Sequence, residues 1–390
     1  MKISFFSNYL NEHQLPLCQA WESMDGIEFT FIALSQQGGN AGRRNMNNEF
    51  PFVLREYEGE ELSRAALKHA IEDDLVIFGH MGGKEQYVRA RVDKGGISFR
   101  STERPLKKGY LWRFFPLKAA RMHNWFTKYS NKNMYILCAS AFAAGDLSLC
   151  GWPVSKCYRW GYFPDSGSFG LRGFSGCEPI SILWASRFID WKRPFAPLEL
   201  AKSLKDRGYN FRMIVAGDGP LRNKMISFIK ENKLSGTVSM PGMLSGEETK
   251  KLMLQSDIFL ATSSCKEGWG ATVNEAMGAG CAVVASASIG SAPFLVNDGN
   301  NGFLYDDLSD DDLMIKVCRL LDDRSLIENL GMAARRTIDS AWSAKIAANR
   351  LVMLAKSIQA GDDCPFASGP CSLSLSLENG WYHKKGDVVG

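Results

Sequence analysis

Glu267 and Glu275 are two glutamates eight residues apart, and their type and spacing could support ligand binding or catalysis. Glu267 precedes Gly268 in a glycine-flanked loop, and Glu275 lies in a short helical stretch of small residues. A helix start presents unpaired N–H groups and the positive end of the helix dipole, which suits an anionic group such as a diphosphate. The two carboxylates would then hold something polar and uncharged, such as sugar or ribose hydroxyls.

Two cations complement this segment. Arg187 and Lys192 follow a predicted strand at 180–185 with the spacing Arg-x4-Lys. At one strand end, facing a cleft that also receives the two glutamates, they would neutralise a diphosphate leaving group. The plainer alternatives are surface cations for this pair, and helix-capping or solvent-facing carboxylates for Glu267 and Glu275.

These residues need a scaffold, and alternating strand and helix patterns predict βαβ units around parallel sheets. In the first half the predicted strands are 3–7, 28–34, 50–56, 75–79, 97–100 and 134–139, with helices at 15–24, 60–72 and 84–93. In the second half the predicted strands are 180–185, 211–216, 237–241, 258–262, 282–286 and 303–305, with helices at 194–207, from after 220 to about 232, and at 247–255, 310–321, 325–337 and 343–358.

The predicted organisation is two α/β domains. A first domain covers 1–165, a turn-rich linker 166–178 and a second domain 179–345. A last helix at 346–360 is expected to cross back to the first domain, and the tail 361–390 is expected to be disordered or loosely docked.

Composition narrows the class of protein. The chain has 390 residues, 45% hydrophobic and 23% charged, which is typical of a globular protein of roughly two to three domains. The net charge of +4 is too small to indicate a nucleic-acid partner. Ten cysteines without metal-ligand spacing indicate reduced thiols. With neither a signal peptide nor an apolar run long enough for a membrane helix, we expect a cytoplasmic protein that does not span a membrane.

Ligands of parallel sheets collect at the carboxyl ends of strands, which makes two first-domain loops candidates. Asn11 and His13 follow the first strand, and His80 follows the strand at 75–79, directly before Met-Gly-Gly. For His13 the alternative is a polar residue at a helix start. For His80 a cleft position and a surface position are equally consistent with the sequence.

An acid-free segment is the remaining unusual feature, because no Asp or Glu occurs from Arg104 to Gly145. Within 104–132 its cations alternate with Trp, Tyr and Phe. This pattern is typical of a segment that binds an anionic membrane surface, or of a solvated basic face over a partly buried helix. Nucleic acid is a third alternative, which we do not expect because no recognised nucleic-acid module accompanies the segment.

The second half resembles the donor domain of the retaining GT-B glycosyltransferases of family 4, also called glycosyl transferases group 1. The resemblance rests on Ala185-Ser186-Arg187 with Lys192, on 215–220 (Val-Ala-Gly-Asp-Gly-Pro), on Pro241-Gly242, and on the motif 267–280 followed by 297–304. The segment 217–219 begins like a dinucleotide motif but lacks its third glycine. The similarity is clear over about 180–305.

The resemblance implies a fold and roles for residues. The fold would be GT-B, two Rossmann-like domains facing across a cleft. Arg187 and Lys192 would bind the donor diphosphate, and Glu275 the ribose. Glu267 would bind the donor sugar, together with the backbone N–H groups that follow it. These N–H groups belong to Gly268, Trp269, Gly270, Ala271 and Thr272. Pro241 to Met243 would line the base pocket.

This chain departs from the family in its first domain. Many members carry a glycine-rich turn after the first strand and a histidine after a later strand. In this chain the corresponding segments are 8–14, which contains no glycine, and 98–103, which contains no histidine. Three residues therefore compete to contact the reacting sugar: His80, Glu103 and His13.

The expected activity is transfer of a sugar from a nucleotide-diphosphate sugar to a glycan or lipid-linked acceptor with retained configuration, as in bacterial surface polysaccharide synthesis. By the same resemblance we expect neither a metal nor another cofactor. The basic-aromatic segment 104–132 suggests a membrane-bound acceptor, and with it a peripheral location at the inner face of the plasma membrane. Two alternatives stay open: a GT-B sugar-nucleotide epimerase and a non-catalytic nucleotide-sugar-binding subunit.

Overall fold

The computed structural model describes residues 1–36, 44–164, 179–309 and 311–386, and the chain divides into two compact units. Unit 1 comprises Met1–Pro164 and Trp342–Glu378, and unit 2 comprises Asp165–Ala341 and Asn379–Gly390. The chain therefore passes between the units three times. The predicted linker 166–178 lies outside the described residues.

Unit 1 contains a seven-stranded parallel sheet with the order β3-β2-β1-β4-β5-β6-β7. The strands are β1 (Lys2–Ser7), β2 (Glu28–Ala33), β3 (Val53–Arg55), β4 (Leu75–Phe78), β5 (Ser98–Thr102), β6 (Met134–Cys138) and β7 (Cys157–Arg159). All four residues of β4 are buried, as expected of a parallel strand covered on both faces. The first six match the predicted strands, whereas β7 was not predicted.

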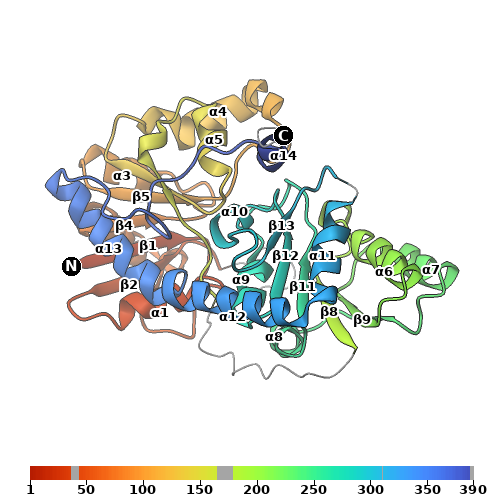
Figure 1. Cartoon of the computed structure of the whole chain (residues 1–390). Helices are drawn as coiled ribbons and strands as arrows, with labels where there is room; N and C mark the ends of the chain where they lie inside the picture. The colour runs from red at the N-terminus through yellow and green to blue at the C-terminus, as the bar shows by residue number, and fades with distance from the viewer. Residues whose placement is uncertain (37–43, 165–178, 310, 387–390) are drawn as a thin grey trace. The chain divides into compact units, whose positions relative to one another are not determined.

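Helices surround this sheet, and they include one from the C-terminal part of the chain (Figure 1). They are α1 (Leu15–Glu22), α2 (Glu60–Glu72), α3 (Gln86–Asp93), α4 (Pro116–Trp125), α5 (Ala143–Ser148) and α13 (Ala344–Ala360), with short 3-10 turns η1 (Glu56–Glu58), η2 (Tyr110–Phe114), η3 (Thr127–Tyr129) and η4 (Val154–Lys156). Helix α13 packs on α1, where the Trp21 indole donates to the Ala348 carbonyl at 3.2 Å. The predicted end of the second domain at 345 is late, because Trp342 stacks on Phe163 within unit 1.

The expectation of a disordered or loosely docked tail is wrong for residues 361–386. The Arg159 N–H donates to the Ser372 carbonyl at 2.7 Å, and the Ser374 N–H donates to the Cys157 carbonyl at 2.8 Å. These bonds cover the outer edge of β7, whose backbone groups would otherwise lack partners. In unit 2, α14 (Trp381–Gly386) is fixed where the Trp381 indole donates to the Ala287 carbonyl at 3.0 Å.

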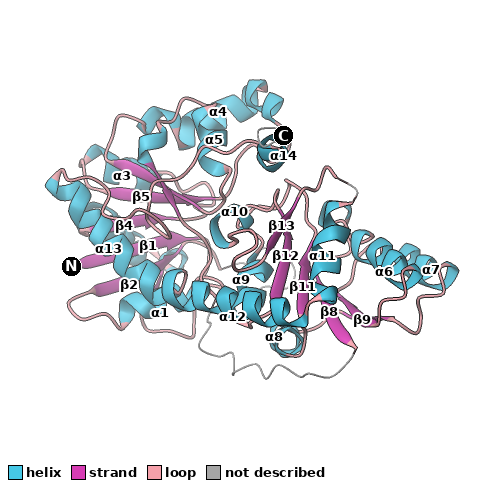
Figure 2. Ribbon diagram, in the orientation of Figure 1, coloured by secondary structure: helices cyan, strands magenta, loops and turns pink. Residues whose placement is uncertain are grey.

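Unit 2 contains a six-stranded parallel sheet with the order β10-β9-β8-β11-β12-β13. Figure 2 labels β9, β8, β11, β12 and β13 of this sheet. Its strands are β8 (Ile180–Ala185), β9 (Phe211–Ala216), β10 (Val238–Gly242), β11 (Ile258–Ala261), β12 (Ala282–Ser286) and β13 (Phe303–Tyr305). Its other elements are η5 (Asp190–Lys192), α6 (Ala196–Asp206), α7 (Arg222–Glu231), α8 (Gly246–Leu254), α9 (Ala271–Gly278), α10 (Ala292–Leu295), α11 (Asp312–Asp322) and α12 (Arg324–Ala341). All six strands match the predicted ones.

Both sheets reverse their strand order at one point. In unit 1 the first strand, β1, pairs with both β2 and β4, and in unit 2 the first strand, β8, pairs with both β9 and β11. The connections leave in opposite directions there, and in sheets of this kind ligands usually bind at the carboxyl ends of the strands beside such a point. The loops after β1 and β4, and those after β8 and β11, are therefore the places to look for ligands.

Gly217, which directly follows β9, fixes the spacing between its own loop and the loop after β8. It has a φ of +135°, and a Cβ added there would lie 1.9 Å from the Ser186 carbonyl oxygen. Its N–H donates to the Gly242 carbonyl at 2.8 Å, so the ends of β8, β9 and β10 meet at this glycine. Its role is close backbone packing.

We expect Gly217→Ala to destabilise the protein by at least about 2 kcal/mol, because it adds both backbone strain and a clash. Thermal unfolding should show a melting temperature lower by about 4 °C or more. The matched control is Gly236→Ala, where a Cβ would meet nothing within 4 Å. Equal melting temperatures for the two variants would contradict this explanation.

Candidate functional site

The predicted cations lie at the point where the sheet of unit 2 reverses. Arg187 follows β8, and Lys192 ends η5 in the same loop. Trp191 brings the two together, because the Arg187 guanidinium carbon lies 5.5 Å and the Lys192 Nζ 4.7 Å from the centre of its ring. The ring quadrupole attracts cations held over an aromatic face, which positions both of them beside Trp191. The sequence analysis missed Trp191, although its place between the two cations was a signal.

Glu267 joins this group from the neighbouring loop. Its carboxylate forms an ion pair with the Lys192 ammonium. The two side chains are only 12% and 14% exposed, so solvent screens the pair weakly. The predicted sugar-side carboxylate and one predicted phosphate ligand are thus in direct contact.

Side-chain and backbone hydrogen bonds hold the two loops together. The Thr262 hydroxyl donates to the Lys192 carbonyl at 2.8 Å and accepts from the Trp184 indole at 2.8 Å. The Ser264 N–H donates to the Trp191 carbonyl, also at 2.8 Å. These partners position η5 against the β11 loop, and no motif in the sequence signalled them.

Helix α9 begins next to this ion pair. Gly270 precedes it in the left-handed conformation, with a φ of +84°, and a Cβ there would lie 2.7 Å from the Ile289 Cγ2. Ala271 and Thr272 form the first turn and are half-buried, so their N–H groups lie at the positive end of the helix. Glu275 follows in the next turn and is also half-buried.

Two neighbours of Glu267 are buried. Gly268 is buried, and Trp269 is fully buried, with its indole donating to the Asn274 Oδ1 at 2.8 Å. A side-chain contact between Trp269 and a donor is therefore excluded. The ring instead packs behind the loop, which leaves only the backbone of Trp269 for the predicted role.

The predicted base pocket lies at the end of β10. Pro241 and Gly242 are its last residues, and Met243 follows with 65% of its surface exposed. Because the strands of this sheet are parallel, these residues lie at the same carboxyl end of the sheet as the loops after β8 and β11.

In unit 1, two predicted residues meet through Tyr162. The His13 ring stacks on Tyr162 with centroids 5.7 Å apart, and the Tyr162 hydroxyl donates to the Glu103 Oε1 at 2.6 Å. His80 is exposed at the end of β4. Asn11 is 7% exposed, and its Oδ1 accepts from the His13 N–H at 3.1 Å, so Asn11 serves its own loop.

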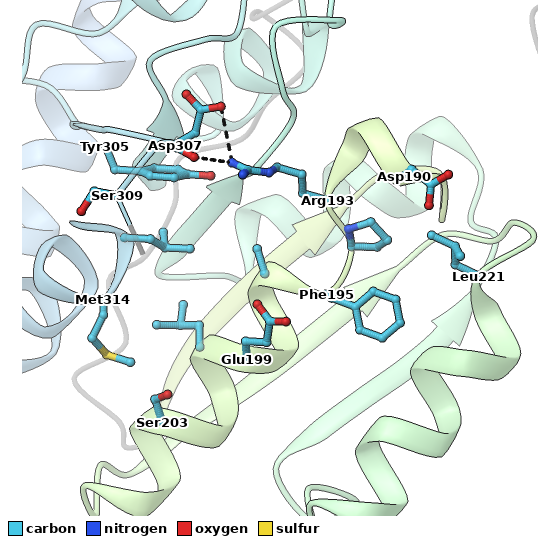
Figure 3. A pocket seen from close by; sticks show the side chains of 14 residues that line it. Asp190, Arg193, Phe195, Glu199, Ser203, Leu221, Tyr305, Asp307, Ser309 and Met314 are labelled. Carbon is cyan, nitrogen blue, oxygen red and sulfur yellow. Dashed lines mark hydrogen bonds and ion pairs between the residues drawn. The ribbon is translucent and has the colours of Figure 1, made fainter. Parts of the chain in front are cut away.

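A cavity of about 360 Å³ lies beside η5 in unit 2 (Figure 3). Arg193 and Asp307 form an ion pair at its upper wall, next to Tyr305. Burial raises the pKa of the Tyr305 hydroxyl, which therefore stays protonated. None of the residues predicted to bind the donor lines this cavity. Its charged lining residues are one cation, Arg193, and three carboxylates, Asp190, Glu199 and Asp307. The group around Lys192 has two cations and one carboxylate, so it suits a diphosphate better.

In the described part of the chain, no cluster of three or more His, Cys, Asp or Glu side chains is arranged to hold a metal ion. Within the same residues, no helix combines the length and the apolar character needed to cross a membrane.

A comparison with protein families matches residues 176–337 to the glycosyl transferases group 1 model. These residues form a glycosyl transferases group 1 domain. The domain contains Arg187, Lys192, Glu267 and Glu275, whereas the first-domain candidates His13, His80 and Glu103 lie outside it.

Relatives of known name support this assignment. WcaL of Escherichia coli is 30% identical over 167 residues, 41% of each chain. The amylovoran biosynthesis glycosyltransferase AmsK of Erwinia amylovora is 26% identical over 227 residues, 56% of this chain and 55% of AmsK. The chain thus spans about half the length of the curated relatives it matches.

A solved structure extends the likeness to both units. HepE of Anabaena, in complex with UDP, is 15% identical with a TM-score of 0.66, and the match covers 92% of this chain and 100% of HepE. At this identity the likeness shows the fold, which is GT-B with two Rossmann-like domains.

We expect Lys192→Met to destabilise the protein by about 3 kcal/mol, because it leaves the buried Glu267 carboxylate without its cation. Adding Glu267→Gln should recover most of that loss, so a double-mutant cycle should give a coupling of at least about 1 kcal/mol. The measurement is denaturant unfolding of the four proteins. As a control, Lys251→Met breaks an exposed pair with Glu247 and should leave stability unchanged. Additive effects of the two site changes would contradict the buried pair.

Proposed function

We propose that this protein is a retaining glycosyltransferase that moves a sugar from a nucleotide-diphosphate sugar to a glycan or lipid-linked acceptor. The observation that carries the proposal is the meeting of Arg187, Lys192 and Glu267 beside the start of α9, at the reversal point of the sheet. The family of the domain and the bound UDP of HepE support a nucleotide donor. AmsK, named for amylovoran biosynthesis, supports a role in bacterial surface polysaccharide synthesis.

In this proposal the bond between the anomeric carbon and the distal phosphate oxygen breaks, and the acceptor oxygen bonds to the same face of that carbon. Because the acceptor oxygen itself attacks the anomeric carbon, no protein nucleophile is required. The acceptor proton leaves with the nucleoside diphosphate. Arg187, Lys192 and the N–H groups of α9 stabilise the charge that develops on the leaving phosphate. A diphosphate would then share Lys192 with Glu267, which binds the donor sugar.

We assign the remaining contacts from the family resemblance. Glu275 binds the ribose hydroxyls, and Pro241 to Met243 line the base. Of the first-domain candidates, His13 and Glu103 are linked through Tyr162 and are the better pair for the acceptor, while His80 is the separate alternative. A lipid-linked acceptor would place a cytoplasmic protein at the inner face of the plasma membrane.

The first experiment is a thermal-shift screen against nucleotide sugars, because a donor well above its dissociation constant stabilises the folded state. The donor found is then incubated with lipid-linked and free glycan acceptors, and the configuration of the product is read by NMR. Epimerised or hydrolysed donor without transfer would favour the epimerase, and tight binding without turnover would favour a binding subunit. An inverted product would contradict retention.

We expect Glu275→Gln to weaken donor binding by about 10- to 100-fold, because a hydrogen bond to a charged group contributes about 1.5 to 3 kcal/mol. Calorimetric titration with the donor from the screen measures this. Glu231→Gln, which removes an exposed carboxylate at the end of α7, should bind normally. Unchanged affinity in Glu275→Gln would remove this residue from the ribose.

We also expect transfer to continue in excess EDTA, because Arg187 and Lys192 supply the positive charge at the diphosphate. The rate should fall less than two-fold, and added Mg²⁺ should not change it. A complete loss of activity that Mg²⁺ restores would contradict the metal-independent mechanism.

A further inference from the structure

The corner between η2 and α4 in unit 1 exposes an unusual group of apolar side chains. Fourteen large apolar residues are exposed in the described part of the chain, and five of them lie within 111–117. Their exposed fractions are 76% for Leu111, 40% for Trp112, 67% for Phe114, 54% for Phe115 and 88% for Leu117. The Trp and the two Phe residues in this set are the only Trp and Phe among the fourteen. Apolar surface gathered in this way marks a site of interaction.

Basic residues surround this corner, which we call the 111–117 tip. Lys107, Lys108 and Arg121 are exposed, and Arg113 and Lys118 are half-buried. Acidic side chains are absent from the sequence between 104 and 145.

Several cations lie over aromatic rings of the same segment. The Lys108 Nζ lies 5.5 Å from the centre of the Trp112 ring, and the Arg113 guanidinium carbon lies 4.7 Å from that of Phe114. The tip therefore combines apolar ends with charges at its base, which suits the boundary between lipid tails and head groups.

The base of the tip is firmly held. Arg104 forms an ion pair with Asp146 at 3.0 Å, and both side chains are fully buried. The Asp146 carboxylate also accepts from the Leu106 N–H at 2.8 Å. On the other side, Met122 and Phe126 are each 3% exposed and belong to the core of unit 1. The exposed side chains thus project from a fixed base and have not simply failed to pack.

We propose that the 111–117 tip inserts into the surface of an anionic lipid bilayer. The cations attract the phosphate-bearing leaflet, and the apolar residues enter the boundary of the hydrocarbon region. Two of the most exposed side chains, Leu111 and Leu117, are aliphatic and cannot stack on bases, which favours lipid over single-stranded nucleic acid. The proposal does not depend on the transferase proposal, because binding to lipid requires neither donor nor acceptor.

The test is co-sedimentation of the full chain with vesicles of phosphatidylglycerol and phosphatidylcholine, and with vesicles of phosphatidylcholine alone. We expect at least ten-fold tighter binding to the anionic vesicles, weakening as salt is added. Leu111→Ser with Leu117→Ser should weaken it more than ten-fold, since each leucine contributes apolar burial. Lys108→Gln with Arg121→Gln should reduce it by roughly ten-fold or more, mainly at low salt.

A matched control removes two exposed apolar residues elsewhere, by Ile315→Ser with Met332→Ser on α11 and α12 of unit 2. This variant should bind vesicles as the wild type does. Melting temperatures and donor binding of all variants should be unchanged, which separates lipid binding from folding and from catalysis. Absence of wild-type binding to anionic vesicles, equal binding by the leucine variant, or binding only to a single-stranded oligonucleotide would each overturn the proposal.

Discussion

The buried ion pair between Lys192 and Glu267 is the contact on which the candidate site depends. It joins the loops after β8 and β11, where the sheet of unit 2 reverses its order. A charge with so little solvent around it is stable only with its partner in place, so the pair fixes the register of the two loops. Trp191 then holds Arg187 near the same point, and Gly270 allows α9 to start beside it. The candidate site thus has cations on one side, which suit the diphosphate, and a carboxylate on the other, which suits the sugar hydroxyls.

Much of this arrangement could be predicted from the sequence, because parallel sheets bring the ends of their strands to one edge. The order of strands, the Arg-x4-Lys spacing and the two glutamates were sufficient to gather Arg187, Lys192 and Glu267 in one place. Contacts that depend on side-chain packing were beyond such reasoning. Trp191 and Thr262 carry no motif, and Trp269 has the position of a ligand although it lies in the core.

The first unit shows the same division between topology and packing. The loops after β1 and β4 were located correctly at the reversal point, since strand order alone determines it. Tyr162 and its contacts with His13 and Glu103 were not predicted, because they link segments distant in sequence. The tail was also misjudged. Its alternating Ser and Leu residues resemble a flexible segment, yet they cover the edge of β7.

The central claim is that a nucleoside diphosphate binds at the reversal point of unit 2, and a crystal structure with bound UDP, the nucleotide found in HepE, tests it most directly. We predict phosphate oxygens within about 3 Å of the Lys192 Nζ and of the Arg187 guanidinium, with the α9 start facing them. A diphosphate bound instead in the cavity beside Arg193 and Tyr305 would contradict the account.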